Sequence, residues 1–382
     1  LKDTRKGTRA IAEELGVQYV LAGSVRKAAD NLLVTAQLID ARADEHVWAE
    51  RFSGTLQDVF EIQGQLSRSI VDSLRLQLTS QEEQKFRARP IEDSRAYDAY
   101  LKATHEGSKA TKEGVTRAIR LTEEALAQGG ENALLAATLA QSYYMAYDNG
   151  FSHDQETLDK VEQWAQKALE LDPARYDAAV ELANQYSISR RNGEAAELLN
   201  RYEDALANSP LYLDLAGTIY TDIGLPEKAW PLYQKSTKLQ PGVDLFQANR
   251  ASCAVYLGKI DEARTIYQNL LQRFPTHRRN HYHLSRLEKA RDFEHIDRMK
   301  AVLRDDERPP RNNIPMYFAL GKELEDLQEW DEAFEAFHRG AGVRRKTVEF
   351  DEASEIEMFE FLEQRFTADW VDDGSTGHDA EA

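Results

Sequence analysis

PLYLDLAGTIYTDIGLPEKAWPLYQKSTKLQP, residues 210–241, decides the fold, because its pattern returns one step later along the chain. Four residue types recur together at a spacing of 34: Gly224 and Gly258, Ala229 and Ala263, Tyr233 and Tyr267, and Pro241 and Pro275. A fixed period of this length is typical of a helical repeat array, in which each unit buries its apolar face against its neighbours. The sequence therefore predicts stacked helix pairs before it indicates any chemistry.

The same stretch shows how one helix pair is built. Small residues such as Gly217 and Ala229 let two helices approach closely, and Tyr233 fills the space beside them. Pro241 ends the second helix because it lacks an amide donor. This period and these residues resemble the tetratricopeptide repeat (TPR) family, whose helix-turn-helix units usually bind partners and do no chemistry. The resemblance predicts a mainly α fold, a right-handed TPR α-solenoid.

The domain organisation follows from where the pattern begins and ends. The sequence predicts a partial α/β domain at 1–80, a linker at 81–94, about seven TPR units at 95–345, a capping or connector helix at 346–370 and a disordered acidic tail at 371–382. An insertion is expected around Asn149-Gly150. About three extra residues are expected near 190–193, because Pro173 and Pro210 are 37 residues apart.

The first zone reads as a small α/β module. Residues 8–15 predict a helix, and three strand-like runs follow at 17–27, 32–41 and 46–52. Thr55, with Asp58 three residues later, resembles a capping box that starts a second helix. A three-stranded meander flanked by two helices is therefore expected.

This zone resembles the TolB-like amino-terminal domain that bacteria place ahead of TPR arrays. The resemblance rests on four short motifs: Tyr19-Val20-Leu21, Gly23-Ser24-Val25, Ala36-Gln37-Leu38-Ile39-Asp40 and Trp48-Ala49-Glu50-Arg51. It covers only the second half of the family domain, and it implies a docking or spacer module without catalytic residues. Relatives of this architecture often carry the module behind a kinase, cyclase or DNA-binding domain, which predicts a regulatory attachment as one alternative role.

A second resemblance concerns residues 314–366. Leu320-Gly321-Lys322, Asp331-Glu332-Ala333-Phe334 and Arg344-Arg345 are similar to the last repeat and connector of TPR-linked bacterial sulfotransferases. In that family a Ser-Gly-Thr-Thr loop after the connector cradles the phosphate of the sulfate donor. This chain has no such loop, so the resemblance predicts a substrate-recognition arm rather than the donor site.

Composition limits the classes of partner. The formal charge of −18 and a pI near 5.1 argue against nucleic acid and against an anionic membrane surface. The sequence has no run of about 18 apolar residues that would predict a membrane span. One cysteine, Cys253, excludes an internal disulfide and fits a bacterial cytoplasmic location. Because the chain opens with Leu1-Lys2-Asp3, we expect it to be a piece of a longer protein.

The usual catalytic signatures are missing, so we predict no catalytic, cofactor or metal site and no enzyme activity for this chain. His277, His281 and His283 form the one histidine cluster, and His277 and His281 are spaced for metal chelation on a helix. No acidic residue or cysteine joins them before Glu288, which favours ordinary histidines on a helix surface. Cys253 is interpreted as a packed, unreactive thiol.

The inner groove carries the functional prediction. Positions two, five, nine and twelve of each first helix line the concave side of a TPR solenoid. Two successive units place basic and aromatic residues there: Arg279, Tyr282, Arg286 and Lys289, followed by Phe318 and Lys322. Such a patch could hold an acidic peptide through charge-assisted hydrogen bonds, unless these side chains pair with neighbouring carboxylates. The groove of the preceding units, with Asp214, Thr218 and Ser252, is small and neutral and is expected to act as a spacer.

The sequence thus predicts a non-catalytic scaffold that binds a protein or peptide along a TPR groove, and the basic patch favours an acidic ligand. Two alternatives stay open at this point: the recognition arm of a sulfotransferase, and a regulatory module behind a kinase, cyclase or DNA-binding domain. All three depend on what accompanies residues 1–382 in the whole protein.

Overall fold

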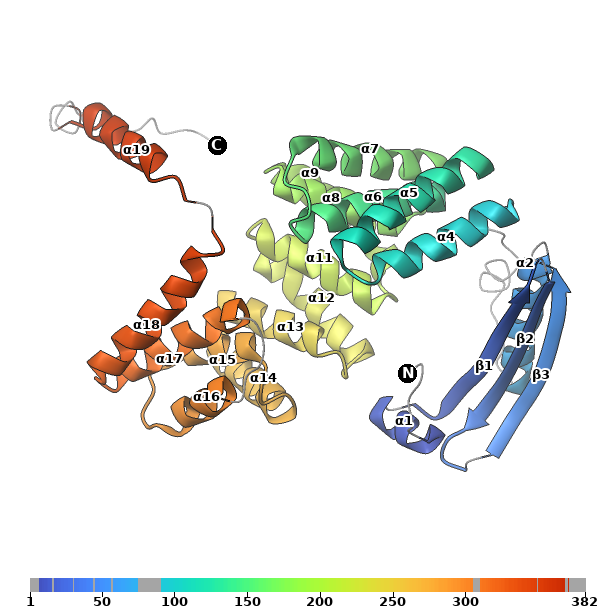
Figure 1. The fold of residues 1–382 in the computed structure, drawn as a ribbon, viewed down its shortest axis with the longest axis horizontal. Coiled ribbons are helices and arrows are strands. Elements are labelled where there is room, and N and C mark those ends of the chain that lie inside the picture. Colours follow the sequence, from blue (N-terminus) through green and yellow to red (C-terminus); the bar gives the residue numbers. More distant parts are fainter. Residues whose placement is uncertain are drawn as a thin grey trace. The chain divides into compact units, whose positions relative to one another are not determined.

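The structure is a computed structural model that describes residues 7–15, 17–29, 31–43, 45–55, 58–74, 91–304, 310–348, 350–367 and 370 (Figure 1). The chain divides into two compact units, residues 1–258 and 259–382. The predicted acidic tail at 371–382 and most of the predicted linker at 81–94 lie outside the described residues.

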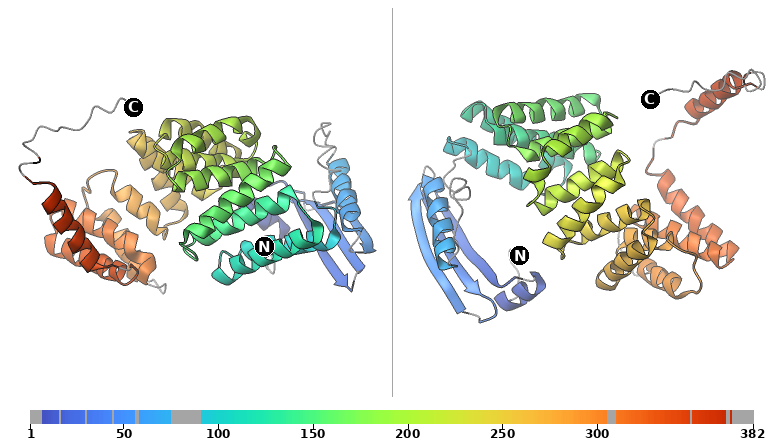
Figure 2. Two further views of the ribbon diagram at one scale, coloured as in Figure 1. Left: turned by 90° about the horizontal axis from the view of Figure 1, so that it is seen from above. Right: turned by 180° about the vertical axis from the view of Figure 1, so that it is seen from behind.

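The amino-terminal module is a three-stranded antiparallel sheet with strand order β1-β2-β3. Its elements are α1 (Thr8–Leu15), β1 (Tyr19–Ala28), β2 (Asn31–Asp40), β3 (Glu45–Thr55) and α2 (Val59–Ser73). Helix α2 lies along β2 and β3 on one face of the sheet (Figures 1 and 2). There Ile62 packs on Leu32, Ala36 and Phe52, which share a face because alternate strand residues point the same way. The predicted meander is confirmed.

Side-chain hydrogen bonds join the end of β3 to the start of α2. The Asp58 carboxylate accepts hydrogen bonds from the Thr55 backbone N–H at 2.7 Å and from the Thr55 hydroxyl at 2.8 Å. The first of these bonds is one half of the predicted capping box, while the Thr55 hydroxyl donates to Asp58 instead of accepting its backbone N–H, and Asp58 itself is the N-cap residue of α2. These bonds stabilise the carboxylate and lower the pKa of Asp58. They tie Thr55, the last residue of β3, to Asp58, the residue before α2.

The rest of the chain consists of helices that follow one another in pairs. In the first unit these are α4 (Ser94–Gly107) with α5 (Lys112–Gly129), α6 (Ala133–Asp148) with α7 (Gln155–Leu171), α8 (Tyr176–Ile188) with α9 (Asn192–Arg201), and α11 (Pro210–Asp222) with α12 (Pro226–Leu239), while α10 (Glu203–Leu206) precedes α11 and α13 (Asp244–Tyr256) comes last. The second unit contains α14 (Ile260–Arg273), α15 (Arg278–Ser285), α16 (Glu294–Arg304), the 3-10 turn η2 (Pro310–Asn313), α17 (Ile314–Asp326), α18 (Trp330–Arg345) and α19 (Glu352–Arg365). The predicted fold class, TPR helices preceded by a small α/β module, is confirmed.

The 34-residue step is visible in the helix starts. Helices α8, α11, α13 and α15 begin at Tyr176, Pro210, Asp244 and Arg278, each 34 residues after the one before. The prediction of extra residues near 190–193 is therefore wrong. Pro210 is the first residue of α11, where proline suits the helix start, whereas Pro173 lies in the loop before α8. The two prolines are not equivalent positions of the repeat.

The turn glycines have the role that their spacing predicts. Gly224 and Gly258 adopt positive φ angles of 81° and 71°, a region that glycine occupies without steric cost. The insertion that the sequence predicts around Asn149-Gly150 is also present, since residues 149–154 form the connection from α6 to α7. No helix in the described part of the chain is both long and apolar enough to cross a membrane.

The close approach of paired helices gives a stability prediction. A Cβ atom added at Gly217 of α11 would lie 2.9 Å from the ring of Tyr233 in α12, and Tyr233 is itself buried and bonded to Thr218 at 3.2 Å. We expect Gly217→Ala to lower the free energy of unfolding by about 1–3 kcal/mol, because the ring has no room to move. Urea denaturation followed by circular dichroism measures the loss.

Gly193 of α9 is the matched control, because a Cβ atom there meets nothing within 4 Å. Gly193→Ala is expected to leave stability unchanged or to raise it by up to about 1 kcal/mol through helix propensity. Equal losses in both variants would contradict the close-packing explanation.

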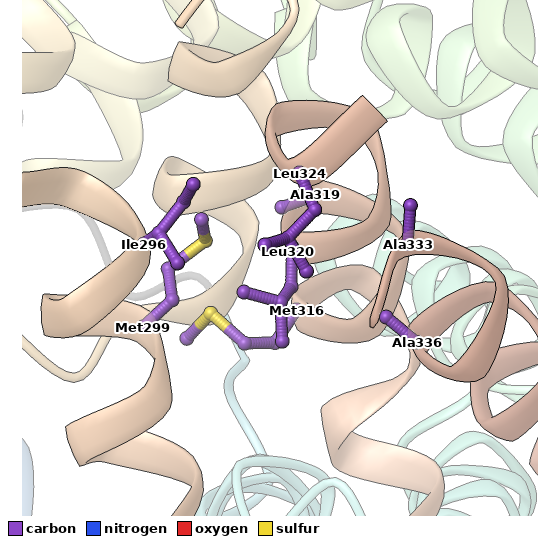
Figure 3. Packing of buried hydrophobic residues seen from close by; sticks show 8 residues of the cluster. All are labelled: Ile296, Met299, Met316, Ala319, Leu320, Leu324, Ala333 and Ala336. Atoms are coloured by element: carbon purple, nitrogen blue, oxygen red, sulfur yellow. The ribbon is translucent and has the colours of Figure 1, made fainter. Parts of the chain in front are cut away.

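The second unit has its own core between α16, α17 and α18. Figure 3 shows its eight buried residues: Ile296, Met299, Met316, Ala319, Leu320, Leu324, Ala333 and Ala336. The residues of α19 are all exposed, including the apolar Phe359 and Leu362, which lie on one side of the predicted capping helix. The helix thus has no buried residue in the described part of the chain, and its predicted capping role stays a prediction.

Candidate functional site: the first-helix surfaces

The predicted basic groove is only partly a helix surface. Helix α15 ends at Ser285, so Arg286 is its carboxyl-terminal cap and Lys289 lies in the loop that follows. The repeat pattern places both residues on the helix, which is wrong. Arg279, Arg286 and Lys289 are exposed, and the Arg286 guanidinium lies 5.4 Å from the ring centroid of Tyr282.

The other two groove residues are engaged within the fold. The Lys322 ammonium donates to Asp326 Oδ2 at 2.6 Å and also to the backbone carbonyl of Glu288. The same Asp326 oxygen accepts the Ala290 N–H at 2.8 Å, so the pair fastens the loop after α15 to α17. Phe318 packs on Phe337 with ring centroids 6.1 Å apart. Lys322 thus pairs with a neighbouring carboxylate, the alternative that the sequence left open.

One member of the histidine cluster, His281, is buried, although the sequence predicts histidines on a helix surface. His281 is 2% exposed, and its Nε2 lies 2.7 Å from the Pro275 carbonyl oxygen. Its Nδ1 lies 2.8 Å from His295 Nε2, and His295 Nδ1 lies 2.6 Å from Glu323 Oε1. The expectation of helix-surface histidines is wrong for His281, because α16 and α17 cover it from later in the chain.

The Pro275 carbonyl oxygen, at one end of this series of hydrogen bonds, determines which histidine nitrogens carry a proton. A carbonyl oxygen can only accept, so His281 carries its proton on Nε2 and offers Nδ1 as an acceptor. His295 must then donate from Nε2, which leaves one proton between His295 Nδ1 and the Glu323 carboxyl. Burial, the first cause, lowers the pKa of His281 to about 4. A proton added to His281 would put two donors face to face.

A cavity of about 450 Å³ adjoins this chain of bonds and is lined in part by His295, Glu323, Arg298 and Lys289. Glu323 Oε2 is buried and accepts no hydrogen bond from the described residues. Within the described ranges, no group of three or more His, Cys, Asp or Glu side chains could hold a metal ion. We interpret the histidine chain as a structural device that joins three helices.

The first unit carries an acidic surface that the sequence reasoning missed. Helices α6, α8 and α11, the first helices of successive pairs, pack on one another and bring together Tyr144, Asp148, Asp177, Glu181 and Tyr212. We call these five residues the Glu181 surface. The Tyr144 hydroxyl donates to Asp148 Oδ1 at 3.3 Å. The predicted neutral spacer groove begins one helix later, with Asp214 of α11.

The Glu181 surface has unusual electrostatics. Burial first, and then the charges of Asp177 and Asp148, raise the pKa of Glu181 to about 8. Burial and the neighbouring carboxylates likewise raise the pKa of Tyr144 and of Tyr212. The negative groups destabilise one another's charges, and the one cation that the described residues place among them, Arg175, is paired with Asp177 and acts in the opposite direction on Tyr212.

Among curated proteins, a relative matches about half of the chain. No family model matches it. A stretch of 190 residues, 49% of this chain, is 33% identical to 32% of a Rhizobium meliloti protein provisionally named adenylate cyclase 3. The chain thus spans about a third of the length of this relative.

Solved structures align with this chain at low sequence identity. A monomeric mutant of IFIT1 with Gppp-AAAA aligns over 80% of this chain and 70% of its own, with a TM-score of 0.49 and 17% identity. YrrB, a TPR protein with an unusual peptide-binding site, aligns over 56% of this chain and 96% of its own, with a TM-score of 0.37 and 17% identity.

The bacterial relative contradicts one prediction. We predicted that this chain is not an enzyme, and about half of it is shared with a protein named as an adenylate cyclase. The motif search could not find this link, because it looked for short catalytic and nucleotide-binding signatures and the similarity extends over 190 residues.

Proposed function

We propose that this chain is a partner-binding TPR segment that regulates a nucleotide cyclase. The observation that carries the proposal is the 33% identity over 190 residues to the protein provisionally named adenylate cyclase 3. Of the three roles that the sequence left open, this is the regulatory one. The resemblance of the first zone to TolB-like modules, which often stand behind such output domains, supports the same choice. The sulfotransferase resemblance stays a prediction.

The physical argument for regulation rests on the surfaces of the repeats. Successive first helices present long rows of side chains, and each row can be specific for one partner without any change of fold. Arg279 and Arg286 remain exposed in the second unit and keep the predicted preference for an acidic partner segment. Binding that favours one arrangement of the whole protein would change the rate of cyclic AMP formation.

The test uses the whole gene product that carries this chain, produced in a bacterial host that lacks its own cyclase. Cyclic AMP is quantified by mass spectrometry for the wild type, for Arg279→Glu with Arg286→Glu, and for Arg201→Glu on the exposed surface of α9 as control. We expect cyclic AMP from the wild type, a change of at least threefold in the double variant, and no change in the control at equal protein levels.

Two results would contradict the proposal in different ways. A wild type that forms no cyclic AMP removes the link to a cyclase. Cyclic AMP that is formed equally by the wild type and the double variant removes the regulatory role of the Arg279 surface while leaving the cyclase link in place.

A further inference from the structure

Glu181 is a largely buried residue whose carboxyl group has no partner among the residues that the structure describes. The residue is 7% exposed, and among the described residues no hydrogen bond or ion pair engages its side chain. Buried carboxylates in folded proteins are normally paired or hydrogen-bonded, because the loss of hydration is not otherwise offset. The groups that act on its charge, Asp177 of its own helix and Asp148 of α6, are both negative.

The cations nearby are committed to other carboxylates. Arg175, just before α8, forms an ion pair with Asp177, and Arg191, just before α9, bridges Glu162 and Glu194. The partner that Glu181 needs is therefore not supplied by these neighbours. The surface around it keeps a net negative charge after the Arg175 pair is counted.

Aromatic rings complete the surroundings of Glu181. Tyr144 and Tyr212 belong to α6 and α11, the two first helices that pack on α8, and the charge of Glu181 contributes to raising the pKa of both hydroxyl groups. Tyr212 is held edge-on against Tyr176 with ring centroids 5.2 Å apart, which fixes its orientation. Tyrosine faces attract cations, and tyrosine hydroxyls accept hydrogen bonds from ammonium and guanidinium groups.

We propose that the Glu181 surface binds the ammonium or guanidinium group of a lysine or arginine side chain from a partner polypeptide. Glu181 pairs with the cation, and Tyr144 and Tyr212 flank its aliphatic stem. The argument is charge complementarity: a largely buried carboxyl without a partner among the described residues, two further carboxylates and two tyrosine side chains lie on the first helices that TPR proteins use for recognition. This inference rests on the proposed partner-binding role of the repeats and not on the cyclase link.

The test measures binding of a defined probe to the purified chain by isothermal titration calorimetry. The probe is an acetylated and amidated peptide of alternating glycine and lysine, compared with the same peptide that carries norleucine in place of lysine. We expect the lysine peptide to bind and the norleucine peptide not to bind. Glu181→Gln is expected to weaken binding at least tenfold, because the amide keeps the shape of the side chain and removes its charge.

Glu197→Gln in α9 is the matched control, because it removes one negative charge from an exposed position of the same unit. It is expected to change the affinity less than twofold. Binding to the wild type should also tighten as the pH rises from 6 to 9, since Glu181 must be ionised to pair with the cation, and Glu181→Gln should remove this dependence. Circular dichroism verifies that both variants are folded.

Three results would overturn the inference. The wild type fails to bind the lysine peptide at millimolar concentration, or Glu181→Gln binds it as tightly as the wild type does. The third is that free spermidine binds at least as tightly as the peptide with the same dependence on Glu181, which would make the ligand a polyamine. None of these results depends on whether the whole protein forms cyclic AMP.

Discussion

Replacing His281 by leucine is expected to lower the free energy of unfolding by about 3 kcal/mol at pH 7. The imidazole joins the Pro275 carbonyl to His295, and its loss leaves a buried acceptor and a buried donor unsatisfied at about 1–3 kcal/mol each. Leucine fills most of the space, so the cost comes chiefly from the broken bonds. Urea denaturation at pH 7 measures it.

The pH dependence identifies the cause of this loss. Burial lowers the pKa of His281 to about 4 in the folded protein, against 6.5 for an unperturbed histidine. The unfolded chain therefore binds more protons between these values, and the stabilisation is complete above pH 6.5 and is lost as the pH falls toward 4. A difference of this size corresponds to about 3 kcal/mol at most. We expect the free energy of unfolding of His281→Leu to depend less on pH than that of the wild type between pH 4 and pH 6.5.

His338 provides the control, because it is an exposed histidine of α18 in the same unit. His338→Leu should change stability by less than about 0.5 kcal/mol and should keep the slope of the wild type. Parallel pH profiles for the wild type and His281→Leu would show that the histidine chain does not link protonation to folding.

The repeat period predicted the parts of this fold that depend on local sequence. Gly224 and Gly258 mark the turns, and Ala229 and Tyr233 pack against the first helix, because each repeat makes the same neighbour contacts. The spacing failed at Pro210, since one proline can end a helix or begin one. A residue type at the right interval does not by itself identify its place in the unit.

The candidate sites depend on contacts that no period contains. His281 is buried by His295 and Glu323, which come 14 and 42 residues later and occur in one place only. Helix α15 ends early at Ser285, which moved Lys289 off the predicted groove. These contacts and this early helix end each occur at one helix only, so a pattern averaged over all repeats does not contain them.

Glu181 was missed because of the rule that selects groove positions. The rule takes positions two, five, nine and twelve of each first helix, and Glu181 occupies position six of α8, between α6 and α11. The signal was nonetheless present in the sequence: a glutamate among alanine, valine and leucine on a helix whose neighbours are buried. A charged residue in an otherwise apolar stretch of a repeat is worth examining for function.

Glu181→Gln is expected to stabilise the protein by about 2–4 kcal/mol at pH 8.5 while it weakens the binding proposed above. The pKa of Glu181 is raised to about 8 in the folded protein, against 4.5 for an ordinary glutamate. The folded state therefore holds its proton more tightly, so stability is complete below pH 4.5 and falls as the pH rises toward 8. The full difference amounts to about 5 kcal/mol, part of which glutamine loses again as a buried amide.

Urea denaturation from pH 4 to pH 9 separates this effect from a general one. The wild type and Glu181→Gln should be equally stable near pH 4, and the difference between their free energies of unfolding should grow up to pH 8. Asp214→Asn is the matched control, because burial raises the pKa of Asp214 only to about 6, which places its divergence between about pH 4 and pH 6. A Glu181→Gln variant that is less stable than the wild type at pH 8.5 would mean that the carboxylate is satisfied within the fold. A gain in stability together with a loss of binding would instead mark Glu181 as a group kept for its partner, because function is commonly retained at a cost in stability.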